Sequence, residues 1–141
     1  PTEAEWEYAC RAGTTTEYSF GDGEARLGDH AWCGVNSVKQ GEPYPHLVGK
    51  KKPNPWGLYD MHGNVDEWCS DWFDEGYYQS LAGQTAIDPA GPATPPSATD
   101  AKRVNRGRHW YFSIMKSSQR DSDNPGDNGL QHGFRVVCEL E

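Results

Sequence analysis

Hydrophobic positions follow a helical period at the start of the chain. One face, at positions i, i+3 and i+4, is formed by Trp6, Ala9 and Cys10. Thr2 and Glu5 have the spacing of a capping box, in which each side chain accepts a hydrogen bond from the other residue's amide. Gly13 follows as a stop signal. The pattern therefore predicts a short capped helix over residues 3–12.

Alternation with a period of two replaces the helical period further along. Residues 58–65 predict a tight helical turn that ends at Gly63, followed by a strand. One face of this strand is expected to carry Trp68, Ser70 and Trp72. Residues 103–111 predict a second strand. A closing strand is expected where the inward residues Phe134, Val136, Cys138 and Leu140 alternate with Arg135, Val137 and Glu139.

Turn-forming residues dominate the rest of the chain. Residues 14–52 predict loops with one short strand at most, and the Ala-Trp-Cys sequence at 31–33 is their expected buried island. Residues 73–102 predict a surface loop, because the proline-rich run at 88–97 cannot hold regular structure for long. The pattern as a whole indicates an α+β protein with little regular secondary structure.

Composition narrows the fold class. The 141 residues include 16 Gly and 10 Pro, and only 35% are hydrophobic. Six Trp, seven Tyr and four Phe supply the apolar area, since each buried aromatic side chain removes roughly 150–250 Å² from water. These numbers predict one domain over residues 1–141 with a small aromatic core. They argue against disorder, and no apolar run has the ~18 residues that a membrane span needs.

Charge and cysteine spacing limit the partners. The net charge is −8, and residues 1–75 carry 14 acidic against 6 basic side chains. Such a chain repels phosphate backbones, so we expect no nucleic-acid partner, whereas its acidic loops suit cations. The four cysteines lie far apart in the sequence, which disfavours a structural zinc site and leaves disulfides or buried thiols.

Four segments in order carry a family resemblance. They are residues 1–9, residues 53–65 with the Glu-Trp pair at 67–68, residues 103–107 with Trp110, and residues 133–137. Together they resemble the formylglycine-generating enzyme, or sulfatase-modifying factor, family. The resemblance implies a loop-rich elaboration of the C-type lectin fold. It also implies an N-terminally truncated domain, because family members have strands before the first helix.

The resemblance fails at the reacting atoms of the family's oxidases. Those enzymes hold copper through two nearby cysteines before the closing strand, and a cuprous ion needs such soft thiolates. Residues 103–135 contain no cysteine, and Met115, Lys116, Ser117 and Ser118 stand where the pair is expected. We therefore expect a noncatalytic ligand- or protein-binding module without copper. The alternative is a divergent oxidase or a sulfoxide-synthase-like domain whose site another segment completes.

The resemblance also implies a structural calcium site at Asp60, Gly63, Val65 and Glu67. Two carboxylates and two backbone carbonyls around a tight turn are the oxygen ligands that calcium prefers. The alternative is that Asp60 caps a turn and Glu67 faces solvent. Asp66 stands where the family usually has Trp, and it adds a third carboxylate.

Two cysteines complete the family-based expectations. Some family members tie the first helix to the last strand, so Cys10 and Cys138 are candidates for a disulfide. Two buried thiols are the alternative.

The last third of the chain resembles the variable region of diversity-generating retroelement proteins, which display diversified residues on this fold for ligand binding. The candidate recognition residues are His109, Tyr111, Phe112, Ser113, Ile114, Asp121, Asp123, Asn128, Leu130 and His132. Exposed aromatic residues beside polar ones are typical of protein recognition. We therefore expect a protein or small-molecule ligand. The alternatives are an ordinary docking loop or, if buried, aromatic residues that belong to the core.

Overall fold

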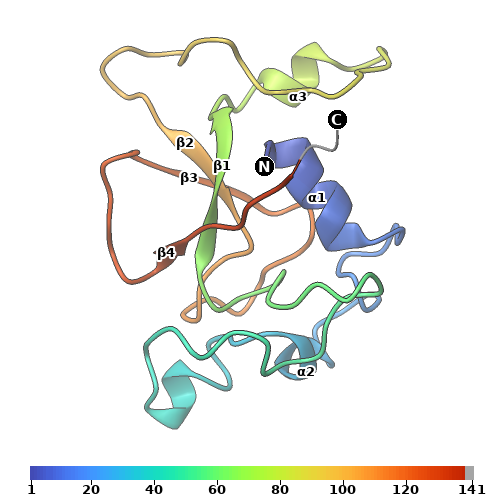
Figure 1. Ribbon diagram of the computed structural model, residues 1–141, viewed down its shortest axis with the longest axis vertical. Helices are drawn as coiled ribbons and strands as arrows, with labels where there is room; N and C mark the ends of the chain where they lie inside the picture. The colour runs from blue at the N-terminus through green and yellow to red at the C-terminus, as the bar shows by residue number, and fades with distance from the viewer. Residues whose placement is uncertain (139–141) are drawn as a thin grey trace.

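A four-stranded sheet forms the centre of the computed structural model, which describes residues 1–138 (Figure 1). Its strand order is β3-β2-β1-β4, with β1 antiparallel to β2, β2 antiparallel to β3, and β4 parallel to β1. The strands are β1 (Asp66–Trp72), β2 (Arg103–Arg106), β3 (Arg120–Asp123) and β4 (His132–Gly133). The helices are α1 (Glu3–Arg11), α2 (Leu27–His30), the 3₁₀ helix η1 (Val38–Gln40) and α3 (Tyr77–Ser80). Long loops join these elements, as predicted.

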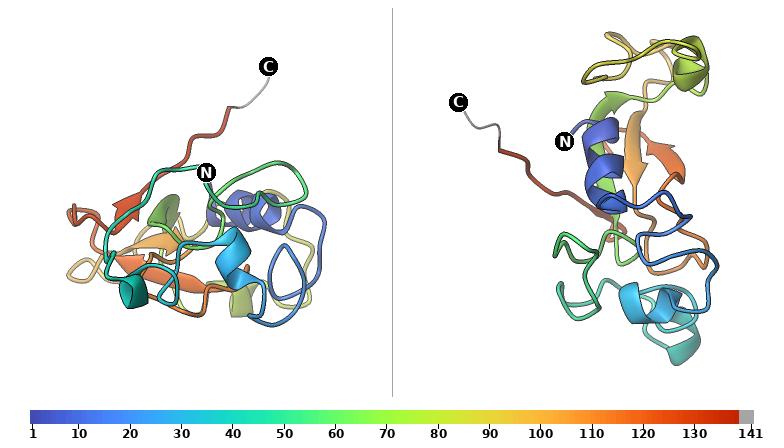
Figure 2. Two further views of the ribbon diagram at one scale, coloured as in Figure 1. Left: turned by 90° about the horizontal axis from the view of Figure 1, so that it is seen from below. Right: turned by 90° about the vertical axis from the view of Figure 1, so that its right-hand side faces the viewer.

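Helix α1 confirms the prediction for the start of the chain. The Thr2 hydroxyl accepts from the Glu5 amide at 3.2 Å, and the Glu5 carboxylate accepts from the Thr2 amide at 2.8 Å. The helix ends at Ala12, which takes the left-handed conformation with φ 48°. It lies across one face of the sheet (Figure 2). There Trp6 and Cys10 join a core cluster completed by Met61, Cys69 and Val104.

The two faces of β1 have different roles. Trp68, Ser70 and Trp72 share a face, as predicted, but this face is the more exposed one. The residues that alternate with them turn toward α1, among them the buried Glu67 and Cys69. We call the face that packs against α1 the inner face and the other the outer face.

A second core cluster stabilises the loop-rich end of the molecule. It consists of Tyr18, Leu27, Ala31, Cys33 and Met115, with Phe20 and Phe112 packed against it. Ala31 and Cys33 are fully buried, which confirms the predicted island at residues 31–33. Residues 14–52 are mainly loops, as predicted: their regular elements are α2 and η1, and in place of a short strand Tyr18 and Trp32 make isolated bridges to Gly21 and Gly63.

The helical turn predicted at residues 58–65 is also wrong, because long-range contacts determine this segment. The Gly63 amide donates to the Gly107 carbonyl at 2.8 Å, rather than to a carbonyl one helical turn earlier. Gly63 has φ +79°, and a Cβ there would lie 2.2 Å from the Trp32 carbonyl oxygen, so only glycine fits. The strand predicted over residues 103–111 ends at Arg106, since Gly107 and Arg108 both take positive φ.

The closing strand is wrong beyond residue 133. Strand β4 covers only His132–Gly133, and residues 134–138 lead away from the body without regular structure (Figure 2). Phe134 and Val136 are 76% and 82% exposed, and Cys138 is exposed rather than inward. Leu140 lies outside the described residues. Alternation predicts a strand only where a neighbouring strand pairs with it, and residues 1–138 provide none for this segment.

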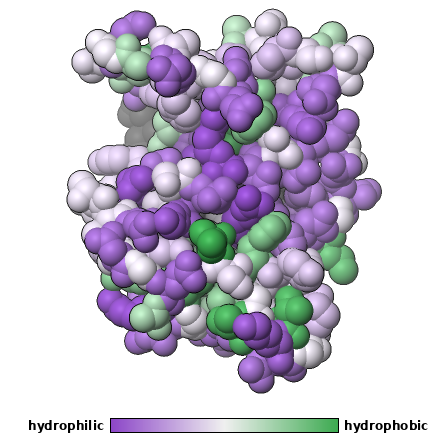
Figure 3. Space-filling model, turned by 180° about the vertical axis from the view of Figure 1, so that it is seen from behind, coloured by the Kyte–Doolittle hydropathy of each residue, from purple (hydrophilic) through white to green (hydrophobic). Residues whose placement is uncertain are grey.

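The surface agrees with the polar composition. Seen from behind, most of it is hydrophilic, and hydrophobic side chains form small separate areas (Figure 3). Within residues 1–138, no helix combines the length and the hydropathy needed to cross a bilayer.

Candidate functional site

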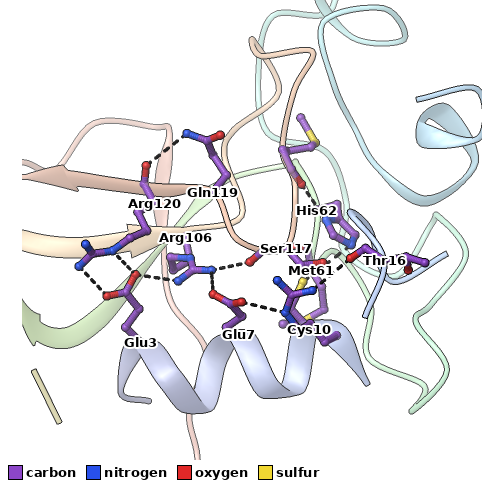
Figure 4. Close-up of polar contacts among 12 residues, drawn as sticks. Glu3, Glu7, Cys10, Thr16, Met61, His62, Arg106, Ser117, Gln119 and Arg120 are labelled. Carbon is purple, nitrogen blue, oxygen red and sulfur yellow. Dashed lines mark hydrogen bonds and ion pairs between the residues drawn. The ribbon is translucent and has the colours of Figure 1, made fainter. Parts of the chain in front are cut away.

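Charged side chains on the inner face form a network of ion pairs beneath α1 (Figure 4). Glu3 and Arg106 are each 1% exposed, and Arg106 Nη1 lies 2.7 Å from Glu3 Oε1. Arg120 of β3 binds the same carboxylate through Nε at 2.7 Å and Nη2 at 2.9 Å. The second Arg106 amino group contacts Glu7 at 2.6 Å. These ion pairs attach the helix to the sheet.

Glu67 belongs to the same face. Its carboxylate accepts from Trp6 Nε1 at 2.6 Å and from two nitrogens of Arg135 at 2.5 Å each. Glu67 is 5% exposed, so the alternative in which it faces solvent is wrong. The Glu67 carboxylate thus links β1 to helix α1 and to the segment that follows β4.

The outer face collects a different set of side chains. Successive residues of a strand point to opposite faces, and paired residues share a face. Strand register pairs Asn105 with both Trp68 and Asp121, and Asp66 with His132. The outer face therefore carries Asp66, Trp68, Asn105, Asp121, Asp123 and His132.

Direct contacts join these outer-face residues. Asn105 Nδ2 donates to Asp123 Oδ2 at 2.8 Å, and His132 Nε2 lies 3.9 Å from the same oxygen. The His132 ring stacks on the Trp68 indole with centroids 4.8 Å apart. An aromatic surface thus lies beside the carboxylates.

The loop that follows β2 closes one side of this group. Arg108 forms an ion pair with Asp121, and its guanidinium lies 4.3 Å from the Phe112 ring centroid. His109 Nε2 is 3.8 Å from Asp66 Oδ2, and its ring contacts Phe112 with centroids 4.7 Å apart. The left-handed backbone of Arg108, φ 63°, turns the loop back over the sheet.

Burial makes this group electrostatically unusual. Asp66 is 4% exposed; burial, followed by the nearby Asp121 and Asp123 charges, raises its pKa to about 7. Burial and the Arg108 charge lower the pKa of His109. Within residues 1–138, four buried polar atoms without a hydrogen-bond partner lie in this group: Asp66 Oδ1, Asn105 Oδ1, Arg108 Nε and His132 Nδ1. Such atoms are uncommon in native proteins and call for an explanation.

The structure brings only part of the predicted recognition set together. The members in this group are His109, Phe112, Asp121, Asp123 and His132. Tyr111 adjoins His109 and is 63% exposed, whereas Phe112 also packs on the second core cluster. Asn128 and the 75% exposed Leu130 lie in the loop between β3 and β4. Ser113 and Ile114 are exposed, and Ser113 lies beside Gly34.

Four residues of this group are absent from the predicted set. They are Asp66, Trp68, Asn105 and Arg108. The alternation around Trp68 contained the signal for Asp66, because the two are two residues apart on one strand and so share a face. Asn105 could not be found in this way, since its place depends on the pairing of β2 with both neighbours.

The predicted calcium ligands only partly fit a metal. Asp60, Val65 and Glu67 line one cavity of about 600 Å³. Asp60 Oδ2 accepts from the Gly49 amide at 2.7 Å, and its buried Oδ1 has no partner, as a ligand oxygen would. Glu67, in contrast, is bound by Arg135. Among the described residues, no three His, Cys, Asp or Glu side chains form a metal-ready group.

The segment at residues 115–118, where the resemblance places the oxidases' cysteines, alternates between buried and more exposed side chains. Met115 and Ser117 are fully buried, and His62 Nδ1 lies 2.9 Å from the Met115 carbonyl oxygen. Arg106 donates to the Ser117 carbonyl. These contacts give the segment a packing role.

The cysteine expectations need correction. Cys10 is a free, fully buried thiol, and burial raises its pKa to about 12. A disulfide between Cys10 and Cys138 is therefore not formed. Cys138 is exposed, so the alternative of two buried thiols is wrong for it as well. The direction of residues 134–138, away from α1, separates the two.

Comparison with known proteins supports this architecture. The model of the sulfatase-modifying factor enzyme 1-like domain matches residues 1–140. The chain belongs to the sulfatase-modifying factor family. A formylglycine-generating enzyme of Streptomyces coelicolor is 37% identical over 154 residues, covering 100% of this chain and 46% of that protein. The chain thus spans less than half the length of this relative.

Solved structures of similar proteins confirm the fold. Treponema denticola variable protein 1 superposes with a TM-score of 0.80 at 38% identity, over 95% of this chain and 45% of that one. PvdO from Pseudomonas aeruginosa superposes with a TM-score of 0.72 at 30% identity, over 94% of this chain and 49% of that one. The chain is therefore similar both to proteins named as enzymes and to a protein named as variable.

Proposed function

We propose that this chain is a noncatalytic binding module of the sulfatase-modifying factor family, and that its outer face and adjoining loops bind a protein or small-molecule ligand. One observation carries the proposal: the exposed Tyr111 contacts His109, which lies beside Asp66, and Asp66 Oδ1 is one of the buried outer-face atoms without a partner. Exposed aromatic anchors are typical of recognition surfaces, and donors or acceptors from a bound ligand would satisfy the buried polar atoms. The divergent oxidase or sulfoxide-synthase-like domain remains the alternative.

The inner face supports this role mechanically. Ion pairs from Glu3 to Arg106 and Arg120 link α1, β2 and β3, so the outer side chains of the same strands have little freedom to rearrange. A rigid site loses less conformational entropy when a ligand binds. The exposed residues of the loops at 109–114 and 124–131 can then change in sequence without disturbing the sheet, whereas Trp110 and Phe112 belong to the packed interior.

The similarity to variable protein 1 supports the further proposal that these loops are diversified. A near-copy of the codons for residues 103–135 beside a reverse transcriptase gene is the expected genomic observation. Without such a copy, the loops form an ordinary docking surface.

Selection of ligands from a random phage-displayed peptide library tests the binding role. We expect the double variant Tyr111→Ala/Leu130→Ala to weaken the selected peptides by about tenfold or more, because exposed aromatic anchors carry much of such binding energy. Ile87→Ala is the matched control, since Ile87 is 83% exposed in the loop of residues 73–102. Equal losses in both variants would contradict the proposed surface.

An activity assay tests the alternative. The protein is incubated with cuprous ion, oxygen and a peptide that carries a sulfatase-type cysteine, and aldehyde is measured by mass spectrometry. We expect no conversion, because residues 103–135 contain no thiolate ligand. Aldehyde formation would refute the noncatalytic assignment.

We propose in addition that calcium stabilises the turn at Asp60. Its buried, unpartnered Oδ1 supports this assignment, and calcium would compete with Arg135 for Glu67. Calcium is expected to raise the melting temperature of the wild type relative to EGTA, since a ligand that binds only the folded state stabilises it. Asp60→Asn should remove the shift and Asp127→Asn should retain it. No shift in the wild type would rule out the site.

A further inference from the structure

The outer face contains acceptors that nothing in the described chain satisfies. Asn105 is fully buried and Asp66 is 4% exposed, and one oxygen of each side chain has no hydrogen-bond partner. Exchanging the oxygen and nitrogen of the Asn105 side-chain amide would not satisfy this acceptor, because the nitrogen already donates to Asp123 at 2.8 Å. Asp66 Oδ1 on β1 and Asn105 Oδ1 on β2 can thus each accept a hydrogen bond that the described chain does not supply.

The charge of this group is also uncompensated. Arg108 forms an ion pair with Asp121 and its charge also acts on Asp66, whereas the only ion-pair contacts of Asp66 and Asp123 among the described residues are His109 at 3.8 Å and His132 at 3.9 Å. Burial and the Arg108 charge lower the pKa of His109, which disfavours the protonated form that could serve as a counter-charge. Neither Asp66 nor Asp123 therefore has a lysine or arginine ion-pair partner among the described residues.

An aromatic surface borders the same acceptors. The Trp68 indole pairs with Asn105 across the strands and stacks on His132. An indole face attracts a nearby cation, most strongly when water is excluded. Unpaired oxygens, unbalanced negative charge and an indole together select against anions and against neutral apolar groups.

We propose that this outer-face group receives an organic cation, the ammonium or guanidinium group of a lysine or arginine side chain in the bound partner. Its N–H groups would donate to Asp66 Oδ1 and Asn105 Oδ1, and its single positive charge would offset part of the negative charge of Asp66 and Asp123. The inference rests on the proposed binding function and specifies the chemistry of the ligand. A metal ion fits less well, since no three metal-binding side chains of the described chain are suitably grouped.

Titration with N-acetyl-arginine amide and N-acetyl-lysine amide, followed by NMR, tests the proposal. The reporters are the Trp68 indole N–H and the Asn105 side-chain amide. Saturable shifts are expected with both cations, and about tenfold weaker binding is expected for N-acetyl-citrulline amide, a neutral analogue of the arginine probe. Equal binding of citrulline, or larger shifts with calcium or zinc ions alone, would overturn the inference.

Two variants with the same charge change locate the site. Asp66→Asn should weaken binding of the arginine probe about tenfold, because it removes a nearby charge and an acceptor. Asp127→Asn removes an exposed acidic charge from the loop between β3 and β4, and we expect less than about a twofold effect through screened solvent. Equal losses would show general surface attraction and refute a defined site. The melting temperature of each variant confirms that it is folded.

The outcome separates this inference from the binding function on which it rests. If peptides selected on the protein depend on Tyr111 but neither contain basic residues nor are displaced by the arginine probe, the binding function holds and the cation site is wrong. If neither peptides nor probe depend on these residues, both are wrong.

Discussion

The inner and outer faces of the sheet both bury charge, but they treat it differently. On the inner face, every carboxylate oxygen of Glu3 and Glu67 accepts from Arg or Trp nitrogens. On the outer face, Asp66 and Asn105 each retain a buried oxygen without a partner. A paired buried charge holds elements in place, whereas an unpaired one raises the free energy of the folded state. The contrast concerns the acceptors, because Arg106 Nε on the inner face is also buried without a partner. It supports the proposal that the outer face binds a ligand while the inner face stabilises the fold.

The strongest test breaks the inner network. Arg106→Met leaves Glu3 and Glu7 without their buried partner, and we expect a loss of about 3–5 kcal/mol in the free energy of unfolding. Urea denaturation measures it. Arg103→Met is the control, because Arg103 lies on the outer face over Trp72 and should cost less than about 1 kcal/mol. Similar losses would remove the distinction between the faces.

A change of opposite sign is expected on the outer face. Asp66→Asn should raise the free energy of unfolding by about 1–2 kcal/mol above the pKa of Asp66, because the folded state then no longer buries an unpaired charge. Glu67→Gln at the adjacent, inner position should lower it. Urea curves of both variants in the same buffer give the comparison. A loss of stability in Asp66→Asn would mean that this carboxylate is structural.

The smallest effect concerns the position of α1 over the inner face. Thr2→Ala removes the hydroxyl that caps the Glu5 amide, and we expect a cost of about 1 kcal/mol. The exposed Thr15 outside the helix supplies a control, Thr15→Ala, with a change below about 0.5 kcal/mol. Thermal unfolding followed by circular dichroism distinguishes the two. Equal curves for both variants would mean that the cap contributes nothing to helix docking.

Local patterns predicted only some elements. The capping box and apolar period gave α1 nearly to the residue, since helix signals lie within a few positions of each other. Residues 134–138 show the limit of local patterns. Their alternation is typical of a strand, but no described strand pairs with them. Residues 58–65 show another, because Gly63 bonds to Gly107 across the molecule. Interactions of long sequence separation are not encoded in a local period.

The candidate site shows the same limit. The resemblance to variable proteins pointed to His109, Asp121, Asp123 and His132, and the structure places these four side chains together, while their role in recognition stays a prediction. Asn105 became visible only through its register with β1 and β3. Glu67 is another example. It is buried and not exposed to solvent because Trp6 and Arg135, which are distant in the sequence, bind its carboxylate.

The amino-acid sequence by itself determined the family, the first helix, the loop-rich architecture and the absence of a cysteine pair in residues 103–135. These properties depend on residue identity and on neighbours along the chain. Only the tertiary structure decided which charges are paired and which are left open, because strands from distant segments must first be placed side by side. The hydrogen-bond donors that a bound partner must supply can be inferred only once the structure shows which acceptors the chain's own donors leave unsatisfied.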